Sequence, residues 1–284
     1  MKVTELAKAK INLTLDVLEK RPDGFHEVEM IMQTIDLTDQ MIFSSRDDTQ
    51  ITIECDVSYV PTDERNLAYK AAALLQRKFS VDQGVNIVLH KKIPVSAGLA
   101  GGSSNAAATL RGLNQLWGLH LSTETLMELA AEIGSDVPFC VLGGGTAIAR
   151  GRGEKIEPIQ KAPPMTILLA KPQLSVSTAV IYQNFSPEQV KRRPDTQMMV
   201  QAIREQDPRK ICDGLGNVLE TVTLGIHPEV DKLKEQMKNF GADGVLMSGS
   251  GPTVFGIVLK EKRAGSIFNA LRGFCNEVFL VRTC

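Results

Sequence analysis

The chain has 284 residues, of which 43% are hydrophobic and 23% charged, so it can bury a substantial core as one large domain or two small ones. Its net charge is -1, with both signs spread along the chain, which gives no electrostatic footprint for nucleic acid or an anionic membrane. Five cysteines without a Cys-x-x-Cys pair indicate neither a disulfide framework nor a zinc site, and no apolar run has the length of a signal peptide or a membrane span. We therefore expect a soluble cytoplasmic protein that binds neither nucleic acid nor membranes.

A strand is predicted over residues 7–17, where apolar side chains occupy the odd positions. Its other face aligns Lys8, Lys10 and Asn12. The alternation alone favours an ordinary solvated face, with lysines in water, over a functional one.

Arg21-Pro-Asp-Gly is a strong turn signal that ends this strand. The apolar run at residues 28–37 is therefore predicted to return antiparallel to the first strand. Phe25 and His26 lie at the exit of the turn. An aromatic ring there usually caps the edge of a core, and a single histidine is usually only hydrogen-bonded.

The next elements are predicted to be short. Residues 41–43 and 50–55 form a pair of short strands joined by a charged loop. A helix rich in alanine and leucine follows at residues 67–79, entered through the polar segment 61–66. Alternating apolar residues at 85–89 predict a strand that leads directly into a glycine-rich loop.

This loop, at residues 94–108, lies between that strand and a helix that stops at Gly118. At its centre are Gly98, Gly101, Gly102, Ser103 and Ser104. Glycines permit a close backbone approach, and a helix N-terminus offers unpaired amides with about half a positive charge, so the turn can cradle a phosphate. A tight strand-to-helix turn with a serine cap is the simpler alternative. The segment matches neither a Walker loop nor the dinucleotide fingerprint.

A further helix is predicted over residues 122–133, and Gly134-Ser-Asp-Val-Pro begins the next element. Asp136 stands before Val-Pro, a favourable position for a helix N-cap, so spacing alone leaves a capping and a chemical role equally open. Glycine clusters at 143–145 and 151–153 then mark a break. We place the domain boundary near residue 160, which gives domains 1–160 and 161–284.

The second half is predicted to contain strands and helices in the split βαβ order of a ferredoxin-like domain. The elements are a strand at 165–170, a short helix at 177–185, several helices of which 228–240 is the clearest, strands at 245–248 and 254–259, a helix around 267–271 and a strand at 278–282. The polar connection 187–194 contains the run Lys191-Arg-Arg, which we predict to be a solvated loop.

Four separated segments resemble, in order, the motifs of the GHMP small-molecule kinases, the family of galactokinase, homoserine kinase and mevalonate kinase. They are Ala9-Lys-Ile-Asn-Leu, Arg21-Pro-Asp-Gly-Phe-His, the loop 94–104 and Ser248-Gly-Ser-Gly-Pro-Thr. Gly134-Ser-Asp-Val-Pro and Arg65-Asn-Leu also match the family, and no motif is broken. Because these matches span both halves, the resemblance outweighs the simpler interpretations given above.

The resemblance implies an α+β fold with two domains. The N-terminal domain would be mixed α/β with a left-handed βαβ unit and would bind ATP, and the C-terminal domain would be ferredoxin-like. The doubled glycine and Arg-Pro-Asp-Gly-Phe-His look most like the branch that uses ATP and Mg²⁺ to phosphorylate the 2-hydroxyl of 4-diphosphocytidyl-2-C-methyl-D-erythritol in non-mevalonate isoprenoid synthesis. We expect this small molecule as the partner and a monomer or weak homodimer.

By the same resemblance, Asp136 is the catalytic aspartate, which accepts the proton of the acceptor hydroxyl. Lys10 would stand beside that hydroxyl, keep the carboxylate ionised and stabilise the forming alkoxide.

The ATP phosphates would be held by Pro94, Val95, Ser96, Ala97, Gly98, Leu99, Ala100, Gly101, Gly102, Ser103 and Ser104. Ser104 is the expected Mg²⁺ ligand. Asn66 matches a position that reaches the nucleotide in the family, although it is equally a polar residue at a helix start.

The substrate would be bound by Asn12, Phe25, His26, Thr178 and Tyr182. Thr178 and Tyr182 lie four residues apart, hence on one helical face. We expect Phe25 and Tyr182 to sandwich the cytosine ring, with His26 at its polar edge assisted by Thr178. The alternative is that the two aromatic rings merely close the edges of two cores.

The sequence leaves two alternative functions for this protein. Another kinase of the family, acting on homoserine or mevalonate, is disfavoured by the Arg-Pro-Asp-Gly-Phe-His turn and the extra glycine. A non-enzymatic nucleic-acid-binding module is conceivable because the N-terminal half of the family shares its fold with such domains, but the near-zero charge and the intact Lys10 and Asp136 disfavour it.

Overall fold

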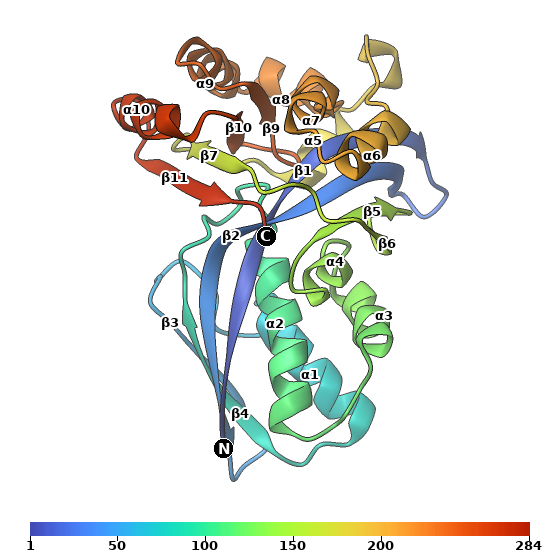
Figure 1. Ribbon diagram of the computed structural model, residues 1–284. Coiled ribbons are helices and arrows are strands. Elements are labelled where there is room, and N and C mark those ends of the chain that lie inside the picture. Colours follow the sequence, from blue (N-terminus) through green and yellow to red (C-terminus); the bar gives the residue numbers. More distant parts are fainter. The chain divides into compact units, whose positions relative to one another are not determined.

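The computed structural model describes residues 1–284 and contains two compact units that interleave along the chain. Unit 1 comprises residues 1–9, 37–95 and 100–143, and unit 2 comprises residues 10–36, 96–99 and 144–284. Two long strands, β1 (Lys2–Lys20) and β2 (His26–Arg46), contribute to both units (Figure 1). Each unit is made of several separate segments of the chain, so the two units do not divide the sequence at a single point. The domain boundary near residue 160 therefore stays a prediction.

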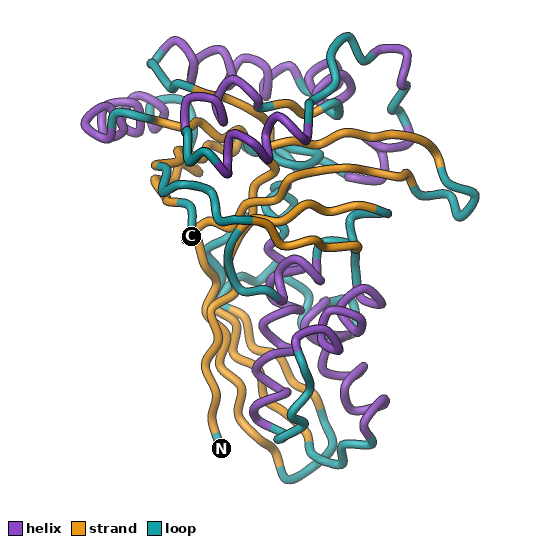
Figure 2. The backbone as a smooth tube through the Cα atoms, turned by 45° about the vertical axis from the view of Figure 1, so that its right-hand side comes forward, coloured by secondary structure: helices purple, strands orange, loops and turns teal.

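Unit 1 contains a βαβ element. β3 (Ile51–Cys55) runs parallel to β4 (Gly84–His90), and the chain passes between them through α1 (Leu67–Phe79). β4 in turn pairs antiparallel with the second half of β2. The predicted left-handed sense of this element stays a prediction. Figure 2 shows the helices of unit 1 gathered on one side of these strands.

The helices of unit 1 follow from their sequence signals. α1 has the predicted bounds, and it buries a small-residue face, including Ala68, Ala71 and Ala72, that allows close packing against α2 (Gly101–Leu116). α3 (Thr123–Ile133) is capped by Ser122, whose hydroxyl accepts the amide of Thr125. The five-residue α4 (Val137–Val141) follows, with proline in its first turn.

The predicted strand at residues 50–55 is confirmed as β3, but residues 41–43 are not a separate short strand. Residues 41–43 continue β2 without a break, and β3 pairs with β4 instead of β2. A parallel crossover places the partner strand of β3 later in the chain, where no local turn signal announces it.

Unit 2 contains the remaining parts of the long strands. β5 (Thr146–Arg150) pairs antiparallel with β2 through residues 30–33, and β6 (Lys155–Ile159) pairs with β5. The short β8 (Gly216–Asn217) pairs parallel with β1 at residues 14–15.

A second sheet in unit 2 confirms the ferredoxin-like prediction. Its strands are β7 (Thr166–Lys171), β9 (Gly244–Met247), β10 (Val254–Val258) and β11 (Glu277–Arg282). They lie in the order β11-β7-β10-β9 with every neighbouring pair antiparallel, so β10 separates β7 from β9 as a split βαβ unit requires.

The helices of unit 2 are α5 (Thr178–Gln183), the 3₁₀ turn η1 (Pro187–Gln189), α6 (Thr196–Arg204), α7 (Pro208–Gly214), α8 (Glu220–Ile226), α9 (Pro228–Asn239) and α10 (Glu261–Arg272). α9 and α10 pack on the second sheet. No helix in the structure combines the length and the apolarity that crossing a membrane requires.

Candidate active site

The polar face of β1 is buried in the structure. Lys10 is 4% exposed and Asn12 is fully buried, and the Lys10 Nζ donates to Asn12 Oδ1 at 2.8 Å. Asn12 Nδ2 points at the sulfur of Met30, 3.1 Å away. The interpretation of Lys10 and Asn12 as part of a solvated face is therefore wrong. Burying polar groups costs free energy unless they are paired, and the hydrogen bond between Lys10 and Asn12 offsets part of that cost.

The glycine-rich loop is anchored to this strand. The backbone amide of Lys10 donates to the carbonyl of Leu99 at 3.2 Å. One residue earlier, Gly98 adopts φ +74°, and a methyl group placed there would lie 2.1 Å from the carbonyl oxygen of Ser248. The Ser248 hydroxyl also donates to the Gly98 carbonyl at 2.9 Å. Glycine is thus required at position 98, and the loop packs directly on the motif 248–253.

The start of α2 has amides to offer an anion. Ala100, the residue before the helix, adopts a left-handed φ of 56° and makes no side-chain cap. Of the first four amides, only that of Ser104 has a partner, the Ala100 carbonyl at 2.8 Å. The amides of Gly101, Gly102 and Ser103 therefore remain for a ligand, as the cradle prediction requires. The simpler alternative, a serine-capped turn, is wrong because no side chain caps α2.

Ser104 ties α2 to β1. Its hydroxyl donates to the carbonyl of Lys8 at 2.6 Å, and the residue is only 2% exposed. An ion that used this oxygen would have to reach it at an almost closed position. No group of three or more His, Cys, Asp or Glu side chains in the structure could hold a metal ion. The assignment of Ser104 as a Mg²⁺ ligand stays a prediction.

A buried ionic cluster fixes both ends of the loop within unit 1, and the sequence analysis missed it. Asp39 of β2 is fully buried and accepts from the Lys91 ammonium, while Asn105 of α2 donates to the same carboxylate at 2.8 Å. The other carboxylate oxygen accepts the amides of Lys92 and Ile93 at 2.7 and 2.8 Å. An aspartate inside an apolar strand run was the available signal for such a cluster.

Asn66 is the N-cap of α1. Its Oδ1 accepts the amide of Ala68 at 2.9 Å, and its Nδ2 donates to the carbonyl of Pro61 at 2.7 Å. The interpretation as a polar residue at a helix start is thereby confirmed. A contact with the nucleotide stays a prediction.

Asp136 occupies the N-cap position of α4, but its side chain makes no capping hydrogen bond. It is half-buried, and its backbone carbonyl accepts the amide of Cys140 at 3.3 Å. Arg111 donates to the Cys140 carbonyl at 2.9 Å and pairs with Glu5, which holds α4 in place. Since a capping bond is absent, the capping role that spacing left open does not explain this aspartate.

The aromatic residues near the first turn form a different pair from the predicted one. Tyr182 of α5 faces His26, with ring centroids 5.4 Å apart and an interplanar angle of 38°, and Phe185 meets the same imidazole edge-on at 6.4 Å. Phe25 is half-exposed and lies under the guanidinium of Arg152, 5.0 Å away. The prediction that Phe25 faces Tyr182 is therefore wrong, because the ring that faces Tyr182 is that of His26.

Thr178 begins α5, and its hydroxyl lies 2.8 Å from that of Ser250 in the motif 248–253. Burial and the nearby Lys20 lower the pKa of His26 below its ordinary value of 6.5, so the imidazole is neutral at pH 7. A neutral imidazole, a phenol and a hydroxyl together can stack on a flat ring and hydrogen-bond its edge.

The chain matches known proteins over both of its halves. The family model of the GHMP kinases N terminal domain matches residues 66–144, and that of the GHMP kinases C terminal matches residues 199–277. The chain is 57% identical to 4-diphosphocytidyl-2-C-methyl-D-erythritol kinase of Brevibacillus brevis, over 99% of this chain and 96% of that protein. Its identity to the protein of the same name from Bacillus subtilis is also 57%, over 99% and 97%.

Solved structures of kinases from the same family also resemble this chain. A crystal structure of 4-(cytidine 5'-diphospho)-2C-methyl-D-erythritol kinase matches with a TM-score of 0.84 and 33% identity, covering 99% of this chain and 98% of that one. The homoserine kinase of Cytophaga hutchinsonii matches with a TM-score of 0.77 and 20% identity, covering 100% and 94%, which shows a shared fold alone. The chain therefore belongs to the GHMP kinase family and, within it, to the group of the 4-diphosphocytidyl-2-C-methyl-D-erythritol kinases.

Proposed function

We propose that this protein transfers the γ-phosphoryl group of ATP to the 2-hydroxyl of 4-diphosphocytidyl-2-C-methyl-D-erythritol, a step of non-mevalonate isoprenoid synthesis. The observation that carries the proposal is the 57% identity, over 99% of the chain, to proteins of that name. The uncapped amides of α2 and the pair of His26 and Tyr182 support it, because they suit a phosphate chain and a flat base.

In this reaction the acceptor oxygen forms a bond to the γ-phosphorus as the bond from that phosphorus to the β,γ-bridging oxygen breaks. The hydroxyl proton passes to the carboxylate of Asp136, and ADP leaves. The ammonium of Lys10 stabilises the negative charge that develops on the acceptor oxygen. Asn12 orients Lys10 through their 2.8 Å hydrogen bond. No other residue has to change its protonation state.

The nucleotide phosphates are assigned to the amides of Gly101, Gly102 and Ser103, with residues 94–100 as the loop that presents them. Mg²⁺ would neutralise charge on the phosphates as they transfer. The amides orient the phosphates, and Ser104 is the side chain assigned to reach the ion.

The cytosine ring is assigned to Tyr182 and His26, with Thr178 and Asn12 as further polar contacts and Phe25 at the rim. His26 is neutral at pH 7 because its pKa is lowered, so one ring nitrogen can donate and the other accept. Homoserine and mevalonate offer no flat ring to these side chains, which disfavours them as acceptors.

We also propose a cytoplasmic monomer or weak homodimer as the working form. None of the five cysteines forms a disulfide, and two of them are buried, which suits a reducing compartment. Sedimentation velocity across a concentration series tests the oligomeric state.

The proposed function is tested by incubating the purified protein with Mg-ATP and one of three acceptors: 4-diphosphocytidyl-2-C-methyl-D-erythritol, homoserine or mevalonate. ADP release is followed by a coupled assay, and phosphorus NMR identifies the new phosphate monoester. We expect turnover with the cytidyl substrate alone and a product phosphorylated at the 2-position. Turnover with homoserine or mevalonate, or a phosphate at another hydroxyl, would overturn the proposal.

A further inference from the structure

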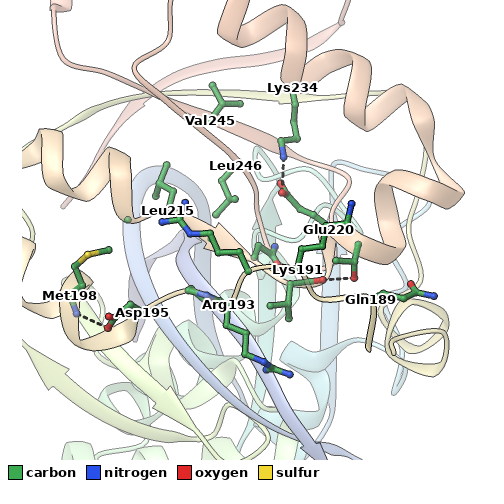
Figure 3. A pocket seen from close by; sticks show the side chains of 17 residues that line it. Gln189, Lys191, Arg193, Asp195, Met198, Leu215, Glu220, Lys234, Val245 and Leu246 are labelled. Carbon is green, nitrogen blue, oxygen red and sulfur yellow. Dashed lines mark hydrogen bonds and ion pairs between the residues drawn. The ribbon is translucent and has the colours of Figure 1, made fainter. Parts of the chain in front are cut away.

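A cavity of about 710 Å³ in unit 2 has no part in the proposed reaction. Its walls come from the segment leading into α6, from residues 214–221 around β8, and from α9 and β9 (Figure 3). None of the residues assigned to ATP or to the cytidyl substrate lines it. A volume of this size is typical of small-molecule sites and would hold far more than a single inorganic ion.

The cavity wall carries an excess of positive charge. Four basic side chains line it against two acidic ones: Lys191, Arg192, Arg193 and Lys234 against Asp195 and Glu220. The acidic side chains are already engaged by the wall itself. Glu220 pairs with Lys234 at 2.6 Å, and its other oxygen accepts the amide of Met247 at 2.9 Å, while Asp195 caps α6.

The three consecutive basic residues 191–193 have two different roles in the cavity wall. Arg193 pairs with Asp16 of β1 at 2.5 Å and also donates to the Val17 carbonyl, so it fixes the segment to the strand. Lys191 and Arg192 line the same cavity, are exposed and form no ion pair. The predicted solvated loop is thus confirmed, although Arg193 is also paired with β1. The other two cations remain for an anion that enters the cavity.

The opposite part of the cavity is apolar. Leu215, Val245 and Leu246 contribute aliphatic surface, and Met198 lies at the rim with 46% of its surface exposed. Figure 3 shows Met198 on the side of Leu215 and Lys191 nearer Glu220. A ligand that satisfied both parts would have an anionic group joined to an apolar body.

We propose that this cavity is a second binding site, separate from the reaction centre, for a small phosphate monoester with an aliphatic body. The phosphate lies at Lys191 and Arg192, and the aliphatic part covers Met198 and the leucine and valine side chains. An inorganic anion alone would meet the two cations but leave the apolar wall wet, so the site favours the ester.

The cavity is also connected to the motif 248–253. Asn217 lines the cavity, and its Nδ2 donates to the carbonyls of Met247 and Gly249 at 2.9 and 2.8 Å. Gly249 in turn packs on Gly98, because a methyl group placed on Gly249 would lie 3.2 Å from the Gly98 carbonyl oxygen. A ligand in this cavity would therefore contact Asn217, the residue that holds the motif packed on the loop assigned to ATP.

The test uses hexyl phosphate and inorganic phosphate as probes in titration calorimetry at 0.15 M salt. A non-hydrolysable ATP analogue and cytidine diphosphate are present at saturation, so that phosphate sites of the reaction centre are blocked. We expect hexyl phosphate to bind one site per chain, more tightly than inorganic phosphate. Lys191→Gln/Arg192→Gln should weaken it at least tenfold, which corresponds to the loss of about one charge-assisted hydrogen bond.

Two further variants separate the site from general effects. Lys262→Gln/Arg272→Gln removes the same two kinds of charge from exposed positions of α10 and should leave hexyl phosphate binding unchanged. Met198→Gln should weaken hexyl phosphate but not inorganic phosphate. Equal binding by wild type and Lys191→Gln/Arg192→Gln, or an equal loss in the α10 control, would overturn the proposal. Since binding is measured directly, this result is independent of whether the cytidyl substrate is the true acceptor.

Discussion

His26 and Tyr182 place their rings 5.4 Å apart, tilted by 38°, although 155 residues separate them. The same imidazole also meets Phe185 edge-on. Two conjugated side chains with a neutral imidazole between them form a surface suited to the flat, polar-edged cytosine ring.

The first prediction concerns this pair. Tyr182→Ala should raise the KM for the cytidyl substrate by about 5- to 150-fold, because stacking on an aromatic ring is worth roughly 1–3 kcal/mol. The KM for ATP should hardly change. Phe25→Ala is the matched control, since Phe25 contacts Arg152 and is half-exposed, so its loss should have the smaller effect. A larger effect of Phe25→Ala than of Tyr182→Ala would restore the original pairing.

The second prediction concerns the titration of His26. Its folded-state pKa lies below the ordinary 6.5 because burial, followed by Lys20, disfavours the charged form. The unfolded chain therefore binds more protons as the pH falls through 6.5, and the contribution of neutral His26 to stability is full above that pH and declines below it. The Tm of wild type minus that of His26→Gln should decrease between pH 7 and pH 5.5. An increase over this range would mean that the folded pKa is raised.

The third prediction concerns the two residues assigned to chemistry. Asp136→Asn and Lys10→Met should each lower kcat by about 10²- to 10⁴-fold, the usual size of general-base and electrostatic contributions. Their effects should not be additive in the double variant. Asp136→Asn keeps the size of the side chain, so the variant should still fold, and its Tm is measured beside kcat to check this. Lys8→Met is the control for Lys10, from the same strand. Near wild-type kcat in Asp136→Asn would remove the base assignment.

The sequence predicted the elements best where the signal was local. α1, α3 and the ferredoxin-like order follow from periodicity and caps, and all were confirmed. The partner of β3 was not predictable in this way, because parallel pairing depends on a strand some thirty residues later.

Some features of the candidate site could likewise be predicted from the sequence, and others could not. The uncapped start of α2 could be foreseen from glycine content, whereas the burial of Lys10 could not, since alternation in a strand does not say which face is covered. The sequence analysis paired Tyr182 with Phe25, whereas the structure pairs it with the next residue, His26. Adjacent residues point to opposite sides of an extended chain, and the sequence does not reveal which of Phe25 and His26 turns inward.

The fourth prediction concerns the glycines of the loop. A side chain at Gly101 would press on Ile93 at 3.0 Å, so substitutions there disturb packing as well as any ligand. A methyl group at Gly102 meets only Leu67, at 3.6 Å, and the position is exposed. Gly102→Ala should therefore keep Tm at or above the wild-type value. Its methyl group would project into the open space through which a phosphate approaches the amides, so the KM for ATP should rise about tenfold, equivalent to roughly one hydrogen bond to a charged group.

Gly98→Ala provides the contrast. The added methyl group would collide with the Ser248 carbonyl at a positive φ, so Tm should fall together with ATP affinity. If Gly102→Ala left the KM for ATP unchanged, the amides at the start of α2 would not be the phosphate site.

The fifth prediction separates two functions of Asp39. One oxygen compensates the buried ammonium of Lys91, and the other accepts the amides of Lys92 and Ile93, where the glycine-rich loop begins. Asp39→Asn alone leaves a buried cation without its counter-charge and should cost about 3–5 kcal/mol. Adding Lys91→Met removes that cation, so the double variant should recover much of the loss in a thermal or denaturant unfolding measurement.

The kinetic comparison then uses two double variants that lack the ion pair equally. Asp39→Asn/Lys91→Met retains an oxygen for the two amides, and Asp39→Ala/Lys91→Met does not. If Asp39 positions the loop, the alanine variant should show a KM for ATP about tenfold above that of the asparagine variant, while the KM for the cytidyl substrate is the same in both. Asp56→Asn is the control, because Asp56 accepts the Lys91 amide from an exposed position, where such contacts are worth little. If the KM for ATP were the same in the two double variants, the acceptor for the loop amides would have no effect on nucleotide binding. Asp39 would then contribute only to the stability of the fold.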